Sequence, residues 1–452
     1  MHVLVVGLGK SGIAAARFFL GQGARVSVTD AAPRQNLDPD ALKYLEDHGV
    51  PVEAGSHSEA LFRSADRIMV SPGVPLNIPA LAAARSRGIP IHGEMDLVRG
   101  LIKAPVAAVT GTNGKTTVTT LLGKLFSAAG KKVFVGGNIG TPLFDYLSGP
   151  RDAEVVVVEV SSFQLDTGGH FAADVGMLLN ITPDHLDRYP SFDAYAESKF
   201  RIFSTEKEGT WAILNADDPE IMKRTDLWPD PNSCLFVSQQ PKIRRGAYLR
   251  GRHVVLTGLP GLTGREEVYD LSGTSLLTPV NMQNAMFAVL AARIMGCPPD
   301  DIMEGLACFS PLPHRLTLVS ETNMVRYYDD SKATNVGAVY AALMSIPGPI
   351  VLIAGGRDKG GDYNILAPAM SGRVKAMLLL GEAKEKMAAA LGHLCPFELV
   401  RDMNEAVQRA ANLARSGDTV LLSPACASFD MFTGYAHRGE VFREAVLALG
   451  RP

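Results

Sequence analysis

Several features are scarce in this chain, and their scarcity narrows the class of protein. The 452 residues include only five cysteines, which are widely separated and show no CxxC spacing: Cys234, Cys297, Cys308, Cys395 and Cys426. This pattern predicts reduced thiols and argues against a disulfide framework or a cysteine zinc site. The 44 basic and 47 acidic residues leave a net charge of −3, so nucleic acid is not an expected partner. No apolar run is long enough to cross a membrane, and a strand begins at the N-terminus without a signal peptide, so we expect a cytoplasmic protein.

What is present indicates an ordinary globular protein. Hydrophobic residues make up 46% of the chain and charged residues 20%. A chain of this length predicts two to four domains.

The first glycine-rich loop follows the N-terminal strand, residues 3–6. The run Gly7-Leu8-Gly9-Lys10-Ser11-Gly12 precedes a predicted helix, and a second strand, residues 25–29, ends at Asp30. This order is typical of a dinucleotide fold, with a diphosphate at the helix N-terminus and Asp30 near a nucleoside. A dehydrogenase and a fold without a ligand both remain open. A rigid loop containing Gly73 follows a further predicted strand, residues 66–72, where α/β proteins bind ligands.

A second glycine loop lies at residues 109–117, after a predicted buried strand at 105–109 and before a predicted helix at 118–129. The arrangement is typical of a phosphate-binding loop, in which backbone N–H groups surround phosphate oxygens. Lys115 would reach the outer phosphates of a nucleotide, and the Thr116 hydroxyl would hold Mg²⁺. The usual loop needs a glycine where Val109 stands, whereas here Gly111 supplies the turn. The alternative is a strand–turn–helix with an incidental Gly-Lys-Thr.

Two side chains that follow this loop in the sequence, Glu159 and His185, are candidates on chemical grounds. Glu159 ends the predicted strand at 154–160, and a carboxylate there needs a partner or a metal. His185 lies in an acid- and His-rich loop, residues 182–188, after the predicted strand 175–180. Lys199 lies on a predicted amphipathic helix, residues 192–203, where a lysine is ordinarily solvated. The alternatives are that the Glu159 carboxylate pairs with a lysine or points into solvent, and that His185 has only a structural role. The pattern weakens between 219 and 275, and no chemistry is evident there.

The last third of the chain alternates strands and helices again. Predicted strands at 325–328, 350–354, 376–380 and 419–422 are followed in three cases by polar clusters, at 329–335, 355–361 and 423–430. Strand ends of a parallel sheet face one edge, so these clusters should converge and suit an anionic substrate. Three solvated loops are the alternative. Three α/β regions, each with an anion-suited edge, predict three ligands and favour a ligase.

The motifs resemble those of the Mur ligase family of peptidoglycan synthesis. The phosphate loop with its shifted glycine, the run Glu159-Val160-Ser161-Ser162-Phe163-Gln164-Leu165, and segments 330–335 and 423–428 carry the resemblance, which spans nearly the whole chain. They are most similar to members that join D-glutamate to UDP-N-acetylmuramoyl-L-alanine. The resemblance implies an α/β protein of three domains: a Rossmann-like UDP-substrate domain at 1–103, a central P-loop ATPase domain at 104–308, and a Rossmann-like D-glutamate domain at 309–452.

The resemblance also implies roles for individual residues. ATP would contact Gly111, Thr112, Asn113, Gly114, Lys115, Thr116, Thr117, Asn281, Asn284, Arg315 and Asp330. The UDP substrate would contact Lys10, Ser11, Asp30, Gly73, Asn138 and His185. D-Glutamate would contact Lys332, Thr334, Lys359, Ser428, Phe429 and Tyr435. Two Mg²⁺ ions would be held by Thr116, Glu159, His185 and Lys199, the last carbamylated by CO₂, and Lys115, Glu159, His185 and Lys199 would be catalytic.

Two positions depart from the family pattern. Relatives often have Phe where this chain has Tyr435, and Ala31 and Ala32 stand where some relatives place an Arg for the uridine, so Arg34 is a candidate substitute. The implied reaction makes an acyl phosphate from ATP and releases ADP and phosphate, in a monomeric enzyme whose third domain closes. A sister ligase for another amino acid, an NAD-dependent dehydrogenase and a nucleotide-binding switch are the alternatives.

Overall fold

The computed structural model describes residues 1–169, 171, 173–186, 188–203, 207–260, 264–310 and 312–449. It is a mixed α/β structure with three sheets, as the sequence predicts. By compactness the chain separates into two units, which are Met1–Asn180, Asp193–Ser272 and Asn284–Cys308 in the first and Ile181–Phe192, Gly273–Gln283 and Phe309–Pro452 in the second. Asp187 of the predicted His185 loop lies outside the described residues.

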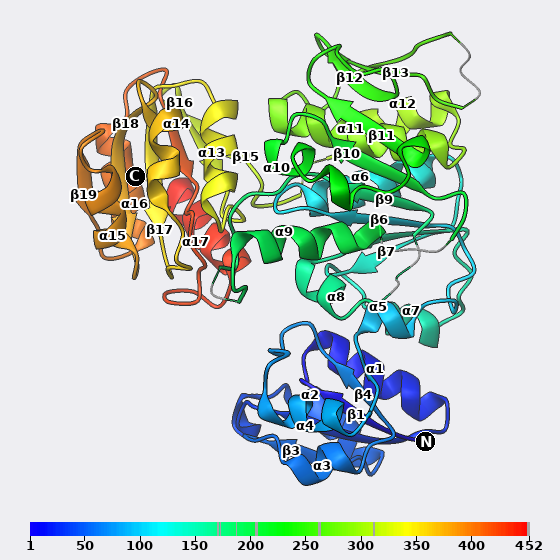
Figure 1. The fold of residues 1–452 in the computed structure, drawn as a ribbon. Coiled ribbons are helices and arrows are strands. Elements are labelled where there is room, and N and C mark those ends of the chain that lie inside the picture. Colours follow the sequence, from blue (N-terminus) through cyan, green and yellow to red (C-terminus); the bar gives the residue numbers. More distant parts are fainter. Residues whose placement is uncertain are drawn as a thin grey trace. The chain divides into compact units, whose positions relative to one another are not determined.

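The N-terminal sheet has five parallel strands in the order β3-β2-β1-β4-β5 (blue in Figure 1). Alternate residues of β1 face opposite sides, because Val3 and Val5 belong to one core and Leu4 and Val6 to another. The elements are β1 (His2–Val6), α1 (Lys10–Gly21), β2 (Arg25–Asp30), η1 (Arg34–Asn36), α2 (Pro39–Asp47), β3 (Val52–Ala54), α3 (Glu59–Arg63), β4 (Arg67–Val70), α4 (Pro79–Ser86), β5 (Ile91–His92) and α5 (Glu94–Leu97).

The central sheet has nine strands in the order β14-β13-β12-β11-β10-β9-β6-β8-β7. Its parallel part, from β7 to β12, carries the glycine loop, and β13 and β14 add an antiparallel edge. The elements up to residue 203 are β6 (Val106–Thr110), α6 (Lys115–Ala128), β7 (Val133–Gly137), α7 (Leu143–Ser148), β8 (Val155–Glu159), α8 (Ser162–Asp166), β9 (Val175–Leu178), α9 (Phe192–Phe200) and η2 (Arg201–Phe203). Those that follow are β10 (Trp211–Asn215), α10 (Pro219–Met222), η3 (Thr225–Leu227), η4 (Pro231–Ser233), β11 (Cys234–Ser238), β12 (Gly246–Arg250), β13 (His253–Thr257), β14 (Glu267–Asp270), α11 (Pro279–Ile294) and α12 (Pro299–Ala307).

Two details of the central sheet differ from the sequence prediction. The helix after the glycine loop begins at Lys115 and not at residue 118, because Gly114 takes a left-handed conformation (φ 85°) and ends the loop there. The span 219–275, where the pattern is weak, supplies strands β11 to β14 of the same sheet. Strands β13 and β14 form the antiparallel edge, and such edge strands bury less apolar surface than central parallel strands, so their sequence signal is fainter.

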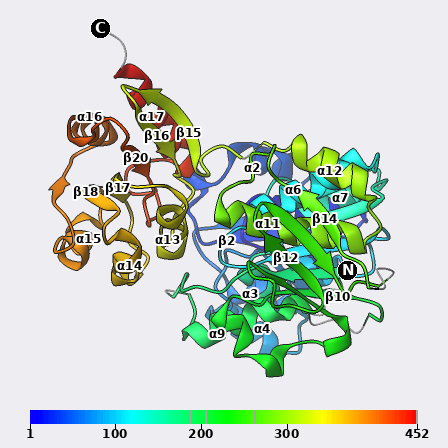
Figure 2. The same cartoon turned by 90° about the horizontal axis from the view of Figure 1, so that it is seen from above.

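The C-terminal sheet has six strands in the order β15-β16-β20-β17-β18-β19, with β15 antiparallel to β16. Helices cover both faces: α13, α14 and α15 pack on one core, and α16 and α17 on another (Figure 2). The elements are β15 (Thr317–Thr322), β16 (Val325–Asp329), α13 (Val336–Ser345), β17 (Ile350–Gly355), η5 (Tyr363–Leu366), α14 (Ala367–Met370), β18 (Val374–Leu380), α15 (Lys384–Leu391), β19 (Phe397–Leu399), α16 (Met403–Leu413), β20 (Thr419–Leu422) and α17 (Tyr435–Ala448).

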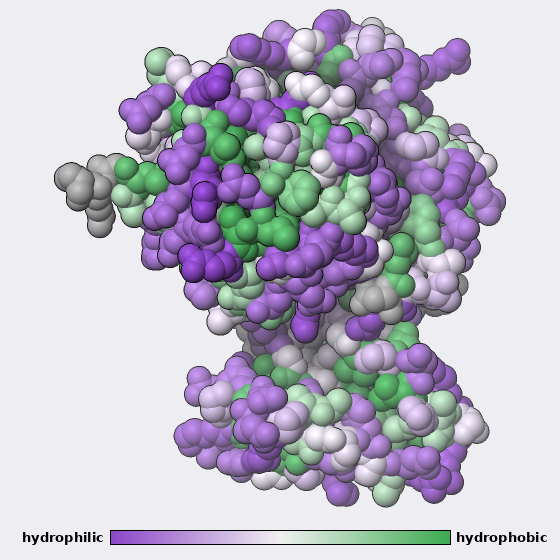
Figure 3. Space-filling model, turned by 90° about the vertical axis from the view of Figure 1, so that its left-hand side faces the viewer, coloured by the Kyte–Doolittle hydropathy of each residue, from purple (hydrophilic) through white to green (hydrophobic). Residues whose placement is uncertain are grey.

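The surface is mixed in character. On the face drawn in Figure 3, apolar side chains form small groups bordered by polar ones. Among the described parts of the chain, no helix is long and apolar enough to span a membrane. The five cysteines are free thiols, and four of them are buried.

Candidate active site

The glycine loop between β6 and α6 is shaped by close contacts of its backbone. Gly111 has φ 153° and Gly114 has φ 85°, both of which disfavour a side chain. A Cβ atom at Gly114 would lie 2.6 Å from Oδ1 of Asn284. The loop is thus pressed against Asn284, one of the residues expected at ATP, and it leads straight into the N-terminus of α6.

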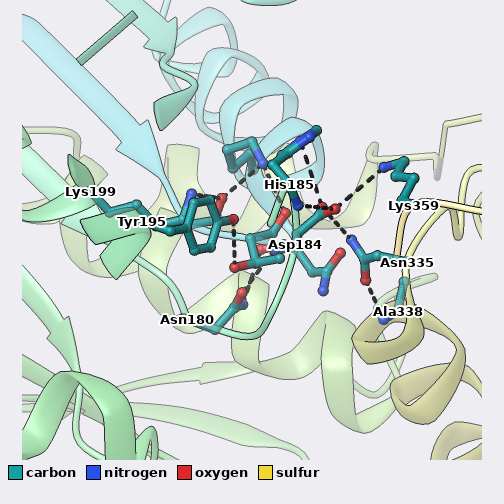
Figure 4. Close-up of polar contacts among 12 residues, drawn as sticks. Asn180, Asp184, His185, Tyr195, Lys199, Asn335, Ala338 and Lys359 are labelled. Carbon is teal, nitrogen blue, oxygen red and sulfur yellow. Dashed lines mark hydrogen bonds and ion pairs between the residues drawn. The ribbon is translucent and has the colours of Figure 1, made fainter. Parts of the chain in front are cut away.

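Two lysines converge on one carbonyl oxygen of this loop. Lys115 Nζ donates to Gly111 O at 2.8 Å and to Thr112 O at 2.9 Å, and Lys199 Nζ donates to Gly111 O at 2.9 Å. Lys199 is only 1% exposed, and its Nζ lies 4.6 Å from the centre of the Tyr195 ring (Figure 4). The interpretation of Lys199 as an ordinary solvated residue is therefore wrong. Helix α9 carries it into the interior beside the loop.

Glu159 ends β8 in a buried position, at 2% exposure. Its Oε1 accepts a hydrogen bond from Nδ2 of Asn138 at 2.7 Å. Its Oε2 is buried and has no hydrogen-bond partner within the described chain. A buried carboxylate oxygen without a partner is costly, and a divalent cation would satisfy it. Both predicted alternatives, a solvated carboxylate and a lysine partner, disagree with this geometry.

No ready-made cluster of acidic, His or Cys ligands surrounds Glu159. Across the described ranges, no group of three or more His, Cys, Asp or Glu side chains is arranged to hold a metal ion. The expected ligand set is of another kind, because it includes the Thr116 hydroxyl and a modified Lys199. The orphaned Glu159 oxygen is the feature that fits Mg²⁺.

A cavity of about 460 Å³ lies beside the first glycine loop. Four of the predicted UDP-substrate residues from the N-terminal sheet line it, namely Lys10, Ser11, Asp30 and Gly73, and Asn138 lines it from the central region. Asp30 accepts the backbone N–H groups of Leu8 and Ala32, each at 2.7 Å. Arg34 pairs with Glu46 and is not among the residues that line the cavity. His57, which the sequence analysis did not single out, is part of the lining and bonds to Thr29 Oγ1 at 2.9 Å.

His185 belongs to the second unit and has a left-handed backbone, with φ 56°. Its neighbour Asp184 accepts hydrogen bonds from Nδ2 of Asn335 at 3.0 Å and Nζ of Lys359 at 3.3 Å (Figure 4). Lys359 and Thr334, both predicted at D-glutamate, line a small hollow here together with Asp184 and His185. The loop that carries His185 therefore lies beside residues that are predicted to bind D-glutamate.

The polar clusters at the C-terminal sheet converge, as expected for strand ends of a parallel sheet. The loop after β20 meets the end of β16 through Ser423 Oγ, which donates to Asp330 Oδ2 at 2.9 Å. It also meets the loop after β17, since Arg357 N donates to Ala427 O at 2.9 Å. The interpretation as three separate solvated loops is wrong.

Side chains expected to contact D-glutamate gather at this edge. Lys332 Nζ lies 3.6 Å from the centre of the Tyr435 ring. Ser428 is 2% exposed, whereas Phe429 is 66% exposed and Tyr435 37%. Tyr435 stands where the family resemblance leads one to expect Phe, and it likewise places an aromatic ring beside Lys332.

Comparison with known proteins decides the family. Three family descriptions match in order: "Mur ligase MurD-like, N-terminal domain" over residues 1–93, "Mur ligase middle domain" over 109–292 and "Mur ligase, glutamate ligase domain" over 314–426. Two relatives named UDP-N-acetylmuramoylalanine–D-glutamate ligase, from Syntrophus aciditrophicus and Geobacter metallireducens, are 43% and 44% identical over 449 and 457 residues, which is 99% of this chain and 98% of each relative. The chain belongs to the Mur ligase family.

Solved structures agree on the fold of this Mur ligase. A pseudomurein peptide ligase type C from Methanothermus fervidus matches with a TM-score of 0.62 at 20% identity, covering 99% of each chain. A MurF ligase from Thermotoga maritima in complex with ADP matches with a TM-score of 0.61 at 18% identity, covering 94% of this chain and 96% of that one. At these identities the likeness supports the three-domain fold alone.

The Mur ligase also contains a buried arginine that sequence reasoning missed. Arg438 on α17 is 1% exposed and donates to Ser331 Oγ (3.0 Å), Ser331 O (2.8 Å) and Cys426 O (3.1 Å). Burial lowers its pKa to about 10 and raises the pKa of Asp330 to about 7. Gly439 was the available signal, because a Cβ there would lie 2.1 Å from Nδ1 of His314.

Proposed function

We propose that this Mur ligase forms an amide bond between the L-alanyl carboxylate of UDP-N-acetylmuramoyl-L-alanine and the amine of D-glutamate, at the expense of ATP. The observation that carries the proposal is the similarity to ligases of that name along 99% of the chain. The buried charges around the glycine loop support the ATP-dependent half of the reaction.

Residues of the glycine loop would hold ATP. Backbone N–H groups of residues 111–117 and the N-terminus of α6 suit the phosphates. Lys115, now on two loop carbonyls, would turn to the γ-phosphoryl group and stabilise its charge during transfer. Asn284 packs on the loop and Asn281 lies on the same helix, while Arg315 and Asp330 would complete the ATP contacts.

Magnesium would be held by Glu159 Oε2 and the Thr116 hydroxyl, and a second ion by His185 and carbamylated Lys199. When bound, Mg²⁺ neutralises charge on the phosphates and on the attacking carboxylate. Asn138 orients Glu159 through its Oε1, which leaves Oε2 for the ion.

The environment of Lys199 supports a carbamate. Two ammonium groups donate to the same Gly111 oxygen, and the Lys199 side chain is buried. Burying a cation next to another is unfavourable. The Lys199 ammonium group first loses a proton, and the neutral amine then reacts with CO₂, which forms an N–C bond and releases a second proton. An anion thereby replaces the cation, which removes this repulsion.

The reaction would proceed by two displacements. The L-alanyl carboxylate attacks the γ-phosphorus of ATP, and ADP departs, giving an acyl phosphate. The D-glutamate amine then attacks the carbonyl carbon, loses a proton, and expels phosphate. Lys332, Thr334, Lys359, Ser428, Phe429 and Tyr435 would hold D-glutamate. No protein nucleophile is needed, so positioning and charge stabilisation dominate.

Three structural expectations remain proposals beside the activity. The domain boundaries at 103/104 and 308/309 lie between the residues matched by the three family descriptions. A monomer is expected, and light scattering would test it. Two bound Mg²⁺ ions are expected, and a structure determined with an ATP analogue would test their number.

One assay tests the reaction and its nearest alternatives. Phosphate release from ATP is measured with UDP-N-acetylmuramoyl-L-alanine and a panel of D- and L-amino acids. We expect release that needs both substrates and is fastest with D-glutamate. A preference for another amino acid would indicate a sister ligase, and release without either substrate would indicate a nucleotide switch.

A further inference from the structure

Glu94 is a buried carboxylate at the start of α5, just after the N-terminal sheet. It is 1% exposed, although acidic residues are rarely buried without a role. The segment is fixed closely against α8, since Gly93 N donates to Thr167 O at 3.0 Å and a Cβ at Gly93 would lie 2.0 Å from Thr167 Oγ1. The position of Glu94 is therefore determined by the backbone around it.

The carboxylate of Glu94 contacts two elements of the central region. Its Oε1 accepts the backbone N–H of Phe144, in the first turn of α7, at 3.3 Å. A carboxylate there also complements the positive end of the helix. Its Oε2 lies 3.5 Å from Nε2 of Gln164 in α8. One side chain thus links two elements that are twenty residues apart in the sequence.

Both contacts adjoin the wall of the cavity beside the first glycine loop, because Gln164 lines that cavity and Phe144 follows the lining residue Pro142 by two positions. Apart from Gln164, the lining residues of that cavity beyond residue 103 lie at the end of β7 or in the loop that leads from it into α7: Gly137, Asn138, Gly140 and Pro142. The amide of Gln164 is held at its other end too, because its Oε1 accepts the Ser161 N–H at 3.0 Å. The donor that faces Glu94 is therefore fixed as Nε2.

We propose that Glu94 is a positioning residue of the UDP-substrate site: its carboxylate fixes the wall formed by residues 137–142 and Gln164, and so sets the affinity for UDP-N-acetylmuramoyl-L-alanine. The proposal rests on the proposed function. It assigns Glu94 no contact with the substrate. The N-terminal side of the cavity, with Lys10 and Asp30, holds the UDP part independently of Glu94.

The protonation state of Glu94 gives the proposal a second observable. Burial raises the pKa of Glu94 to about 7, against the opposing effect of its hydrogen bonds. The charged groups on the elements packed against it are Asp145 on α7 and Asp166 on α8, with His92 and Asp96 along its own segment. The ionised carboxylate accepts from both partners, whereas the protonated form loses one acceptor. The wall is therefore best ordered above pH 7.

The test is a calorimetric titration without ATP, using UDP and UDP-N-acetylmuramoyl-L-alanine as separate ligands. Glu94→Gln is compared with Asp96→Asn, the same chemical change on the same short helix. At pH 8 we expect Glu94→Gln to bind the full substrate about tenfold more weakly, as for loss of one charged hydrogen bond, with UDP affinity changed less than about twofold. Asp96→Asn should match the wild type with both ligands. In the assay, KM for the substrate should rise while kcat stays within about twofold.

A pH comparison of the wild type covers the case in which Glu94→Gln does not fold. UDP alone reports any effect of pH on the N-terminal side of the cavity, so the ratio of the two affinities isolates the wall. We expect the affinity for the full substrate to decrease, relative to the affinity for UDP, between pH 8 and pH 6. Equal ratios at the two pH values, or unchanged affinity in a folded Glu94→Gln, would overturn the role of Glu94. If the wild type does not bind the full substrate at all, the proposed function itself is wrong.

Discussion

The two glycine loops of this Mur ligase share the same strand–loop–helix structure but differ in the hydrogen bonding of the nearby acidic residue. Each follows the first strand of its sheet, β1 or β6, and each opens a helix, α1 or α6 (Figure 1). Each also lies near an acidic residue at the end of another strand. In the N-terminal sheet that residue is Asp30, whose two oxygens accept backbone N–H groups. In the central sheet it is Glu159, one oxygen of which has no partner within the described chain.

This difference supports the proposed roles, in which the first loop only binds a ligand and the second takes part in transfer of a charged group. The first loop is complete by itself, because Asp30 and Ser71 satisfy its backbone. The second holds two lysines on one carbonyl oxygen and a buried carboxylate oxygen unsatisfied, which is a costly arrangement without ATP and Mg²⁺. Its polar groups are therefore arranged to bind charged ligands.

The largest effect should come from removing Lys115. Lys115→Ala should fold normally and lose phosphate release by at least ~10²–10³-fold, as for loss of one transition-state charge donor. Lys124→Ala, an exposed lysine on the same helix, is the matched control and should behave as wild type. Steady-state phosphate release with all three substrates measures the effect. Near-normal turnover of Lys115→Ala would remove the distinction between the two loops.

Lys199 gives the next largest effect. Lys199→Ala should be nearly inactive and should regain part of its activity with a short carboxylic acid, which supplies the missing anion. Lys199→Arg keeps a cation and should not be rescued. Both variants should be tested for folding by circular dichroism, because the side chain is buried. Full activity of Lys199→Ala without added acid would exclude the carbamate.

The sequence predicts the parts of this site that local pattern determines. The glycine loops and the three successive α/β regions follow from periodicity and turn residues, and they are confirmed, although several strands end one or two residues from the predicted positions. The burial of Lys199 does not follow. Ser198 and Lys199 are adjacent on α9 and both are buried, at 0% and 1% exposure. Only the tertiary position of α9 beside the loop explains a lysine there, and the family resemblance, not the pattern, pointed to it.

Other features could not be predicted from the sequence, because their local pattern is short or their partners are distant in the sequence. The edge strands β15 and β19, with half-exposed side chains, lack the apolar run of a central strand. Glu94 and Arg438 are charged residues whose partners lie at least fifty and eleven positions away. Apart from an adjacent glycine, nothing in the neighbouring residues marks them as buried. Glycines next to them, Gly93 and Gly439, are the trace that close packing leaves in the sequence.

The two acidic residues predict opposite consequences when each is made neutral. Glu159→Gln should lower turnover by about 10²-fold, because it weakens the metal site, while stability stays the same or rises as a buried unsatisfied charge is removed. Asp30→Asn should lose about 1–3 kcal/mol of unfolding free energy, since two N–H groups lose a charged acceptor. Urea unfolding and phosphate release should be measured on both. Equal losses of unfolding free energy in the two variants would mean that Asp30 and Glu159 do not differ in how well their carboxylates are hydrogen-bonded.

The smallest effect concerns the ligand of the first loop. UDP should bind the full-length protein and NAD should not, because Asn138 and Gln164 line the cavity of about 460 Å³ on its central side, and their amides suit an amino sugar. Lys10 is exposed, so its attraction to the diphosphate is partly screened by solvent and salt. Lys10→Ala should therefore weaken UDP binding only up to about tenfold, with the loss shrinking at high salt. Calorimetry at two salt concentrations measures this, and Arg25→Ala, an exposed cation outside the cavity, serves as control. NAD binding as strong as that of UDP would return the first loop to the dehydrogenase interpretation, while leaving the central loop unaffected.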